Sequence, residues 1–132
     1  MNLVVAHFTD GRIVKGTTNN FLQGKDRFHL LPQGSGALDK PAEVLFSELK
    51  ALFFVRDLNG DPSRREKNLQ DGARATAGRK LRVQFKDGEV LEGTTQGYQP
   101  GRPGFFIVPV DPESNNERCF VITAATQAIN PI

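Results

Sequence analysis

Hydrophobic and polar residues alternate with a period of two in two separate stretches of the chain. The first stretch ends at Phe8 and the second at Phe85, and their apolar positions are Val4, Ala6, Phe8, Leu81, Val83 and Phe85. Alternation of this kind predicts a β-strand with one buried face. An Asp-Gly pair follows each stretch, at residues 10–11 and 87–88. Asp-Gly after such a strand predicts a hairpin with a type I′ turn, which needs positive φ at both central residues.

The whole pattern occurs twice, because the segment 8–18 returns as the segment 85–95 at an offset of 77 residues (85 − 8 = 77). The offset holds without a gap to the pair Ala51 and Ala128. A repeat of this length is a whole small domain. We therefore expect two units that are related by internal duplication, at residues 1–58 and 79–132.

A polar segment at residues 59–78 separates the two units. It contains one large apolar residue, Leu69, and has turn-forming residues at both ends. This composition predicts an exposed linker with at most one helical turn.

Each unit is predicted to hold five short strands. After the first strand, the others are expected at 12–18, 27–31, 43–46 and 50–56, and at 89–95, 104–108, 120–123 and 127–130. Gly16 and Gly93 lie inside the second strands, where a glycine predicts a sharp bend as a sheet curls. A 3₁₀ turn is expected at 47–49 and at 124–126, with Ser47 accepting a backbone hydrogen bond. The predicted fold class is therefore all-β, with two tandem five-stranded SH3-like (Sm-like) barrels.

Two further features of the predicted strands have structural interpretations. The threonine pairs at 17–18 and 94–95 are expected to be structural, because their hydroxyls can satisfy backbone groups beside a bend. The run Leu52-Phe53-Phe54-Val55 is apolar on both faces of a strand, which predicts burial on both sides. One of the two phenylalanines should fill the first unit. The other should pack against the second unit or a second chain, and we expect the two units to pack about a pseudo-twofold axis.

The loops after the bent strands are the candidate contact sites for a ligand or partner. Each loop carries an aromatic residue with a cation, which is the minimum set for stacking a base or docking an anion. Together with the apolar run, the predicted contact residues are Phe21, Lys25, Arg27, Phe53, Phe54, Tyr98 and Arg102.

Composition and charge narrow the functional classes. With 17 basic and 15 acidic residues the formal charge is only +2, a small excess for a nucleic-acid binder. No acid–base pair, metal-ligand set or phosphate loop is recognisable, and the only histidines are His7 and His29. We therefore expect no enzymatic activity, no cofactor and no metal. A single cysteine, Cys119, fits a reducing cytoplasm, and no apolar run approaches the length of a membrane span.

Two resemblances add to this interpretation. The order of elements in each unit resembles that of an Sm-like or SH3-like barrel. This order is strand, Asp-Gly hairpin, bent strand with glycine, strand, loop, strand, 3₁₀ turn and strand. Three sequence motifs resemble those of an uncharacterised group of bacterial domains. They are Phe-x-Asp-Gly-x-x-x-x-Gly-Thr-Thr at 85–95, Gly-Arg-Pro-x-Phe at 101–105 and Leu-Lys-Ala-x-Phe-Phe-Val-Arg-Asp at 49–57. The resemblance implies the fold but no activity.

The preferred functional interpretation is a binding or assembly module for a protein partner or for self-association. The alternative is a nucleic-acid or nucleotide-binding Sm-like module. It would use Tyr98 for stacking and the basic residues Arg64, Arg65, Lys67, Arg74, Arg79 and Lys80.

Overall fold

Ten β-strands and two short 3₁₀ helices make up the part of the chain that the structure describes. The computed structural model describes residues 1–36, 38–59, 78–99, 101–110 and 114–132. The first half contains β1 (Asn2–Phe8), β2 (Ile13–Thr18), β3 (Arg27–Pro32), β4 (Ala42–Leu45), the 3₁₀ helix η1 (Phe46–Glu48) and β5 (Leu49–Val55). The second half contains β6 (Arg79–Phe85), β7 (Val90–Thr95), β8 (Gly104–Pro109), β9 (Asn116–Ile122), the 3₁₀ helix η3 (Thr123–Ala125) and β10 (Thr126–Pro131).

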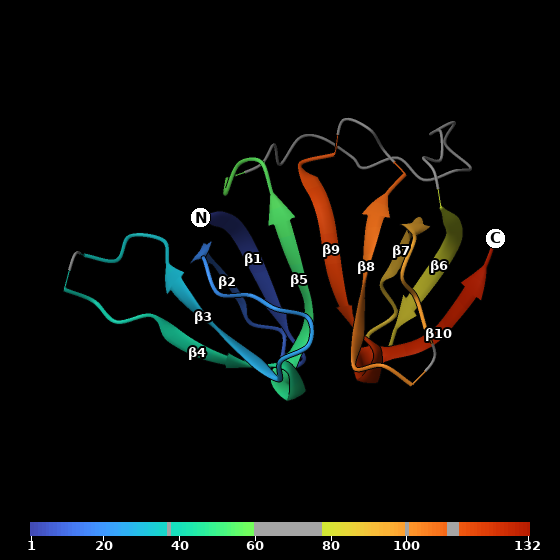
Figure 1. Ribbon diagram of the computed structural model, residues 1–132, viewed down its shortest axis with the longest axis horizontal. Helices are drawn as coiled ribbons and strands as arrows, with labels where there is room; N and C mark the ends of the chain where they lie inside the picture. Colours follow the sequence, from blue (N-terminus) through green and yellow to red (C-terminus); the bar gives the residue numbers. More distant parts are fainter. Residues whose placement is uncertain (37, 60–77, 100, 111–113) are drawn as a thin grey trace.

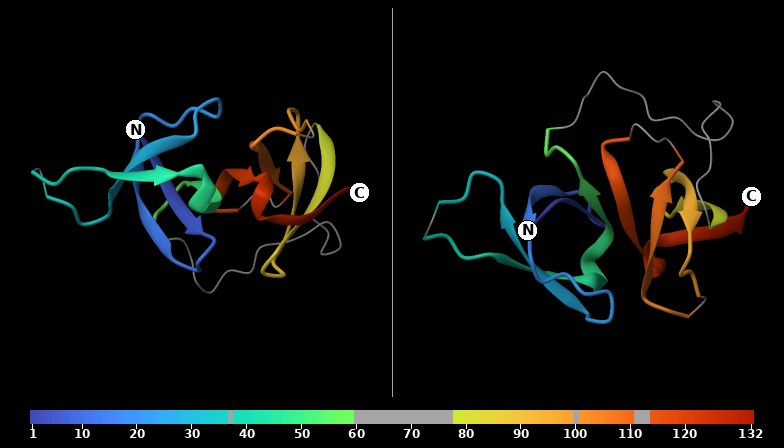
Figure 2. Two further views of the ribbon diagram at one scale, coloured as in Figure 1. Left: turned by 90° about the horizontal axis from the view of Figure 1, so that it is seen from below. Right: turned by 45° about the horizontal axis from the view of Figure 1, so that its top comes forward.

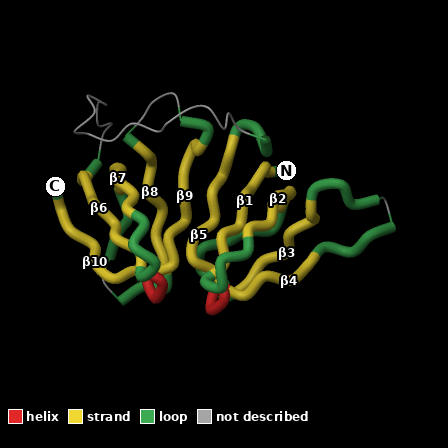
Figure 3. Tube along the Cα trace, turned by 180° about the vertical axis from the view of Figure 1, so that it is seen from behind, coloured by secondary structure: helices red, strands yellow, loops and turns green. Residues whose placement is uncertain are grey.

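The strands form one antiparallel sheet with the order β10-β6-β7-β8-β9-β5-β1-β2-β3-β4. The order within the second half, 10-6-7-8-9, repeats the order 5-1-2-3-4 of the first half. The sheet curls separately within each half, and β5 and β9 lie next to each other in the middle (Figure 1). The view from below shows the two curled halves side by side (Figure 2), and both 3₁₀ helices lie at the same end of the molecule (Figure 3).

The central strand β5 is buried along its whole length and serves two cores. Its neighbours are β1 on one side and β9 on the other. Leu52 and Phe54 belong to the core cluster of the first half, whereas Ala51, Phe53 and Val55 belong to the cluster of the second half. The expectation that one phenylalanine fills the first unit and the other packs against the second is confirmed. β9 likewise contributes side chains to both cores, because Phe120 lies in the first cluster and Cys119 in the second.

The join between the halves is not the pseudo-twofold contact that the sequence suggested. A twofold axis would pair equivalent strands, but β5 pairs with β9, and its own equivalent is β10. The two halves are therefore arranged head to tail. This arrangement leaves β4 and β10 at the outer edges, each with a single neighbouring strand.

The Asp-Gly hairpins form as expected, but with a different turn. Gly11 N–H donates to Phe8 O (3.1 Å) and Phe8 N–H donates to Arg12 O (2.9 Å). Gly11 has a φ of +93° and Gly88 one of +94°, while no described residue other than glycine has a positive φ. The loops are thus three-residue hairpins in which a left-handed glycine follows residues with negative φ. The predicted type I′ turn is wrong, because it would also require positive φ at Asp10 or Asp87.

The 3₁₀ helices begin one residue earlier than expected, at Phe46 and Thr123. η1 has no side-chain cap, so the predicted role of Ser47 is wrong. The predicted linker at residues 59–78, with its helical turn, lies almost wholly outside the described residues.

Gly16 and Gly93 are required by a close approach between neighbouring strands. A Cβ at Gly16 would overlap the backbone oxygen of Leu31, and one at Gly93 would overlap that of Val108. Beside each glycine the repeated threonine bonds the next strand: Thr18 Oγ1 donates to His29 O and Thr95 Oγ1 donates to Phe106 O, both at 2.7 Å. The structural interpretation of these threonines is thereby confirmed.

Lys50 is a buried cation on β5 that reaches into the second half. Its side chain is 8% exposed, and Nζ lies 2.7 Å from Asp87 Oδ2 and 3.3 Å from Glu89 Oε2. The ammonium also lies 4.7 Å from the centre of the Phe85 ring. The hydrogen bond from Lys50, followed by one from the Glu89 backbone, lowers the pKa of Asp87. The hairpin between β6 and β7 is thus tied to the central strand.

We expect Gly93→Ala to lower the free energy of unfolding by about 2–3 kcal/mol, because its Cβ meets a backbone oxygen that cannot move aside cheaply. Gly97→Ala is the matched control, since a Cβ there has no atom within 4 Å. Urea denaturation of both variants would measure the difference. Equal stabilities would contradict the close-approach explanation.

The ion pair between Lys50 and Asp87 should depend on pH with a defined sign. A depressed carboxylate pKa adds stability above the unfolded-state pKa, and this stability is lost as the pH falls through the folded-state value. A double-mutant cycle with Lys50→Met and Asp87→Asn should give a coupling of about 0.5–1 kcal/mol at pH 7, since Asp87 is more than half exposed and screened by solvent. The coupling should approach zero at about pH 2. A coupling that is unchanged at acid pH would contradict the assignment.

Candidate functional site

The same recess occurs in both halves, where the second and third strands of each half diverge. Pairing between β2 and β3 covers only Gly16–Pro32 and Thr17–Leu31, and pairing between β7 and β8 covers only Gly93–Pro109 and Thr94–Val108. The recess of the first half is lined in part by Thr17, Thr18, Asn19, His29 and Leu31. The recess of the second half is lined in part by residues exactly 77 positions later, namely Thr94, Thr95, Gln96, Phe106 and Val108. The two recesses are therefore equivalent.

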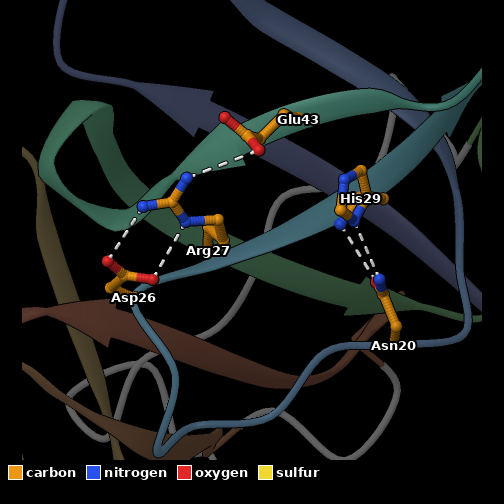
Figure 4. Close-up of polar contacts among 5 residues, drawn as sticks. All are labelled: Asn20, Asp26, Arg27, His29 and Glu43. Atoms are coloured by element: carbon orange, nitrogen blue, oxygen red, sulfur yellow. Dashed lines mark hydrogen bonds and ion pairs between the residues drawn. The ribbon is translucent and has the colours of Figure 1, made fainter.

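In the first half, the side chain of Asn20 bonds β3 beside the recess. Its Oδ1 accepts a hydrogen bond from His29 N–H (3.0 Å), and its side-chain nitrogen lies 2.9 Å from His29 Nδ1 (Figure 4). Thr18 Oγ1 lies 3.3 Å from the same Asn20 oxygen. The carboxamide thus bonds the backbone where β3 has left β2, and the cavity beside it is about 110 Å³.

In the second half, the recess is open. The position of Asn20 is taken by Gly97, and that of His29 by Phe106. The cavity has a volume of about 580 Å³, within the range of small-molecule and peptide side-chain sites. Gly97 is not needed for the backbone, since its φ is not positive and a Cβ there would meet no atom within 4 Å. We call this cavity the β8 pocket.

The lining of the β8 pocket is polar with an aromatic component. Phe106 and Val108 provide its apolar part, and the amides of Gln96 and Gln99 and the guanidinium of Arg102 come from the loop between β7 and β8. Gln23 reaches the pocket from the loop between β2 and β3 of the other half. Both halves therefore build the site, and its described lining supplies hydrogen-bond donors and acceptors and contains no acidic side chain.

The two loop aromatics predicted to contact a ligand turn inward instead. Phe21 is half-buried, and its ring lies 5.4 Å from Phe28, 5.0 Å from Phe120 and 5.9 Å from Phe106. Tyr98 is also half-buried and packs edge-on against Phe105 at 4.7 Å. Both therefore close the ends of the cores, which was the other interpretation of an amphipathic loop.

The three predicted loop cations are in different situations. Arg27 is held by Asp26 (3.0 Å) and Glu43 (3.5 Å), and its hydrogen bond lowers the pKa of Asp26 (Figure 4). Lys25 has no ion pair with the described residues. Arg102 likewise has none with them, and it lines the β8 pocket. Of the three, Arg102 alone both lines this pocket and lacks an acidic neighbour in the described part of the chain.

Phe53 and Phe54 lie inside the molecule, with exposed fractions of 7% and 4%. The apolar run is therefore covered largely by the chain itself. Arg118 covers the outer side of this region, with its guanidinium carbon 4.3 Å from the Phe54 ring centre and 4.4 Å from that of Phe106.

The basic residues of the nucleic-acid alternative lie mostly outside the described residues, namely Arg64, Arg65, Lys67 and Arg74. Arg79 is described and holds the β7–β8 loop, because its Nη2 donates to Tyr98 O (2.9 Å). Lys80 is exposed on β6.

The two histidines do not come together. His7 packs on Phe53 at the join, with ring centres 4.6 Å apart, and burial is the largest cause that lowers its pKa. Within the described residues, no cluster of three or more His, Cys, Asp or Glu side chains could hold a metal ion. No helix in that same part of the chain is both long and apolar enough to cross a membrane.

Sequence reasoning missed Gln23, Gln96, Gly97, Gln99 and Phe106. For Gly97, the ungapped repeat places a glycine where the first half has an asparagine, but the sequence does not show what that asparagine bonds.

The protein therefore belongs to the all-β class. It has one ten-stranded antiparallel sheet, two cores and an open polar pocket. Its sequence matches the model of a family of unknown function, DUF6982, over residues 1–132, and the chain belongs to that family. Comparisons with curated proteins and with solved structures gave no match.

Removing the Asn20 amide should expose the backbone of β3 beside the first recess. We expect Asn20→Ala to lower the free energy of unfolding by about 0.5–1.5 kcal/mol, since His29 N–H loses its acceptor but gains access to water. Amide hydrogen exchange of His29 should accelerate at the same time. Asn20→Asp keeps the accepting oxygen and is the matched control. Unchanged exchange in Asn20→Ala would contradict this role of Asn20.

Proposed function

We propose that this protein is a non-enzymatic binding module for a protein partner, built from two SH3-like (Sm-like) barrels that arose by duplication. The repeated strand order and the equivalent recesses support the duplication. A reducing, cytoplasmic location is part of the proposal and rests on the single cysteine.

The observation that carries the proposal is the contrast between the two recesses. In one copy an asparagine of the chain bonds the backbone of the third strand and the cavity is about 110 Å³, whereas the other copy is open with about 580 Å³ of space. A pocket that a repeat has retained but not filled leaves room for another molecule. The lining residues that the structure describes offer amides, hydroxyls and one cation, which suits the mixed polar and apolar surface of a polypeptide segment.

A nucleic-acid partner fits this lining less well. A surface that tracks a phosphate backbone needs several cations and exposed aromatic rings on which bases stack. Among the described residues, Arg102 is the one cation in the lining, and Tyr98 packs inward on Phe105. The chemistry of the pocket therefore favours a protein partner.

Closing the β8 pocket should abolish partner binding. Gly97→Asn restores the side chain that bonds β3 beside the first recess, whereas Gly97→Ala adds a methyl group into open space. In quantitative affinity enrichment from cells that express the protein, partners retained by the wild type and by Gly97→Ala should be lost with Gly97→Asn. The affinity of a purified partner, measured by calorimetry, should fall at least about tenfold.

Partners that bind Gly97→Asn as tightly as the wild type would overturn the proposal. A salt titration with single-stranded RNA and DNA tests the alternative, because charge-driven binding weakens steeply with salt. Tight, salt-sensitive binding of either would favour the nucleic-acid interpretation over ours.

A further inference from the structure

The first half shows which chemical group the recess accepts. The group is the carboxamide of Asn20, whose oxygen takes a hydrogen bond from the backbone N–H of His29 and whose plane spans the recess to His29 Nδ1. In the second half the corresponding donor is the N–H of Phe106. The ladder between β7 and β8 stops at Thr94 and Val108. Phe106 lies opposite Phe120 of β9, but its carbonyl faces β7, where it accepts from Thr95 Oγ1, and the N–H and C=O of one strand residue face the same neighbouring strand. No side chain in the described residues accepts a hydrogen bond from Phe106 N–H. This N–H is therefore available to an oxygen that enters from outside.

The carbonyl of Phe106 is already satisfied, because Thr95 Oγ1 donates to it at 2.7 Å, as Thr18 does to His29. The surroundings of the free donor are thus built in the same way in both halves. What the second half lacks is the planar group with an oxygen that Asn20 supplies in the first.

We propose that the β8 pocket binds the side-chain carboxylate of an aspartate or glutamate in an extended partner segment, at the place that the Asn20 amide occupies in the other half. This inference rests on the proposed function and names the chemistry of the same site. One carboxylate oxygen takes the position of Asn20 Oδ1 and accepts from Phe106 N–H.

Two further features select a carboxylate over a carboxamide. His29 Nδ1, the group that faces the nitrogen of Asn20, is replaced by the apolar ring of Phe106, so the second position no longer has a partner for an amide N–H. Arg102 adds a cation to the lining without an acidic neighbour in the described residues. A charged acceptor gains from that cation, while an uncharged amide does not.

The size of the pocket points to a residue within a segment and not to a free ion. A volume of about 580 Å³ far exceeds a single carboxylate, and Phe106 and Val108 provide an apolar surface for the methylene groups of an acidic side chain. The amides of Gln23, Gln96 and Gln99 can bond the backbone of the residues on either side.

The test uses the ¹⁵N-labelled full chain and three blocked tripeptides, acetyl-Gly-X-Gly-amide with X as Asp, Asn or Lys. The Asp peptide should shift the amide resonance of Phe106 downfield and saturably, with a Kd on the order of millimolar. Arg102→Gln should weaken the Asp peptide about two- to fivefold and leave the Asn peptide unchanged. The Lys peptide should not bind.

The variants at position 97 provide the control for location. Gly97→Asn should abolish the shift of Phe106, and Gly97→Ala should retain it. No saturable shift with the Asp peptide, an equal shift with the Lys peptide, or acetate alone binding as tightly as the Asp peptide would each overturn the inference. If the peptides fail but Gly97→Asn still loses the protein partner, the proposed function stands and the carboxylate assignment falls. If Gly97→Asn also keeps the partner, both fall.

Discussion

The structure depends on the pairing of β5 with both β1 and β9. Because β5 has a strand on each side, its alternate residues point into two different cores, and all seven of its residues are buried. β9 does the same from the other half, with Phe120 in the first core and Val121 in the second. Neither half therefore has a complete core of its own, and separating them would expose large apolar side chains from both. Because exposing apolar surface costs about 25 cal/mol per Å², we expect the two halves to unfold together as one unit.

The outer edges of the sheet lack the side chains that make the join between the halves. β4 and β10 are the equivalents of β9 and β5, but the residues that make the join are replaced at these edges. Phe53 and Phe54 correspond to Asn130 and Pro131, and Arg118 and Phe120 correspond to Pro41 and Glu43. Proline lacks the N–H that a ladder needs, and a charged or amide side chain does not enter an apolar core. Two complementary strand edges are thus left exposed without the side chains that would join them to another copy.

Much of the fold could be predicted from the sequence because local patterns of residues specify the strands and their bends. Alternation located the strands, the bend glycines located the close approaches, and the run at Phe53 and Phe54 indicated a strand between two cores. The turn type could not be predicted, since Asp-Gly suits both a type I′ turn and a loop that ends in a left-handed glycine. The loop aromatics were misplaced for a different reason: Phe21 packs on Phe106 and Phe120, which the other half brings to it. No pattern within the loop records that neighbour.

The candidate site was missed because it is defined by the absence of a side chain. Gly97 looks like an ordinary loop glycine until it is compared with Asn20, and the comparison becomes meaningful once the structure shows what Asn20 bonds. A bend glycine such as Gly93 has a steric reason to be glycine, whereas Gly97 has none. Sequence analysis cannot separate these two cases, since both appear as a single letter.

The pocket and the join between the halves share a residue, and this links binding to the fold. Phe106 lines the β8 pocket, and its ring also lies 5.8 Å from Phe54 and 5.1 Å from Phe120, with Arg118 over it. Contacts from both halves therefore fix the position of the Phe106 backbone N–H before any ligand arrives. A donor held in place in this way costs little ordering when it binds an oxygen. The second half alone would lack Phe54, Phe21 and Gln23, so the pocket belongs to the joined chain and not to either repeat.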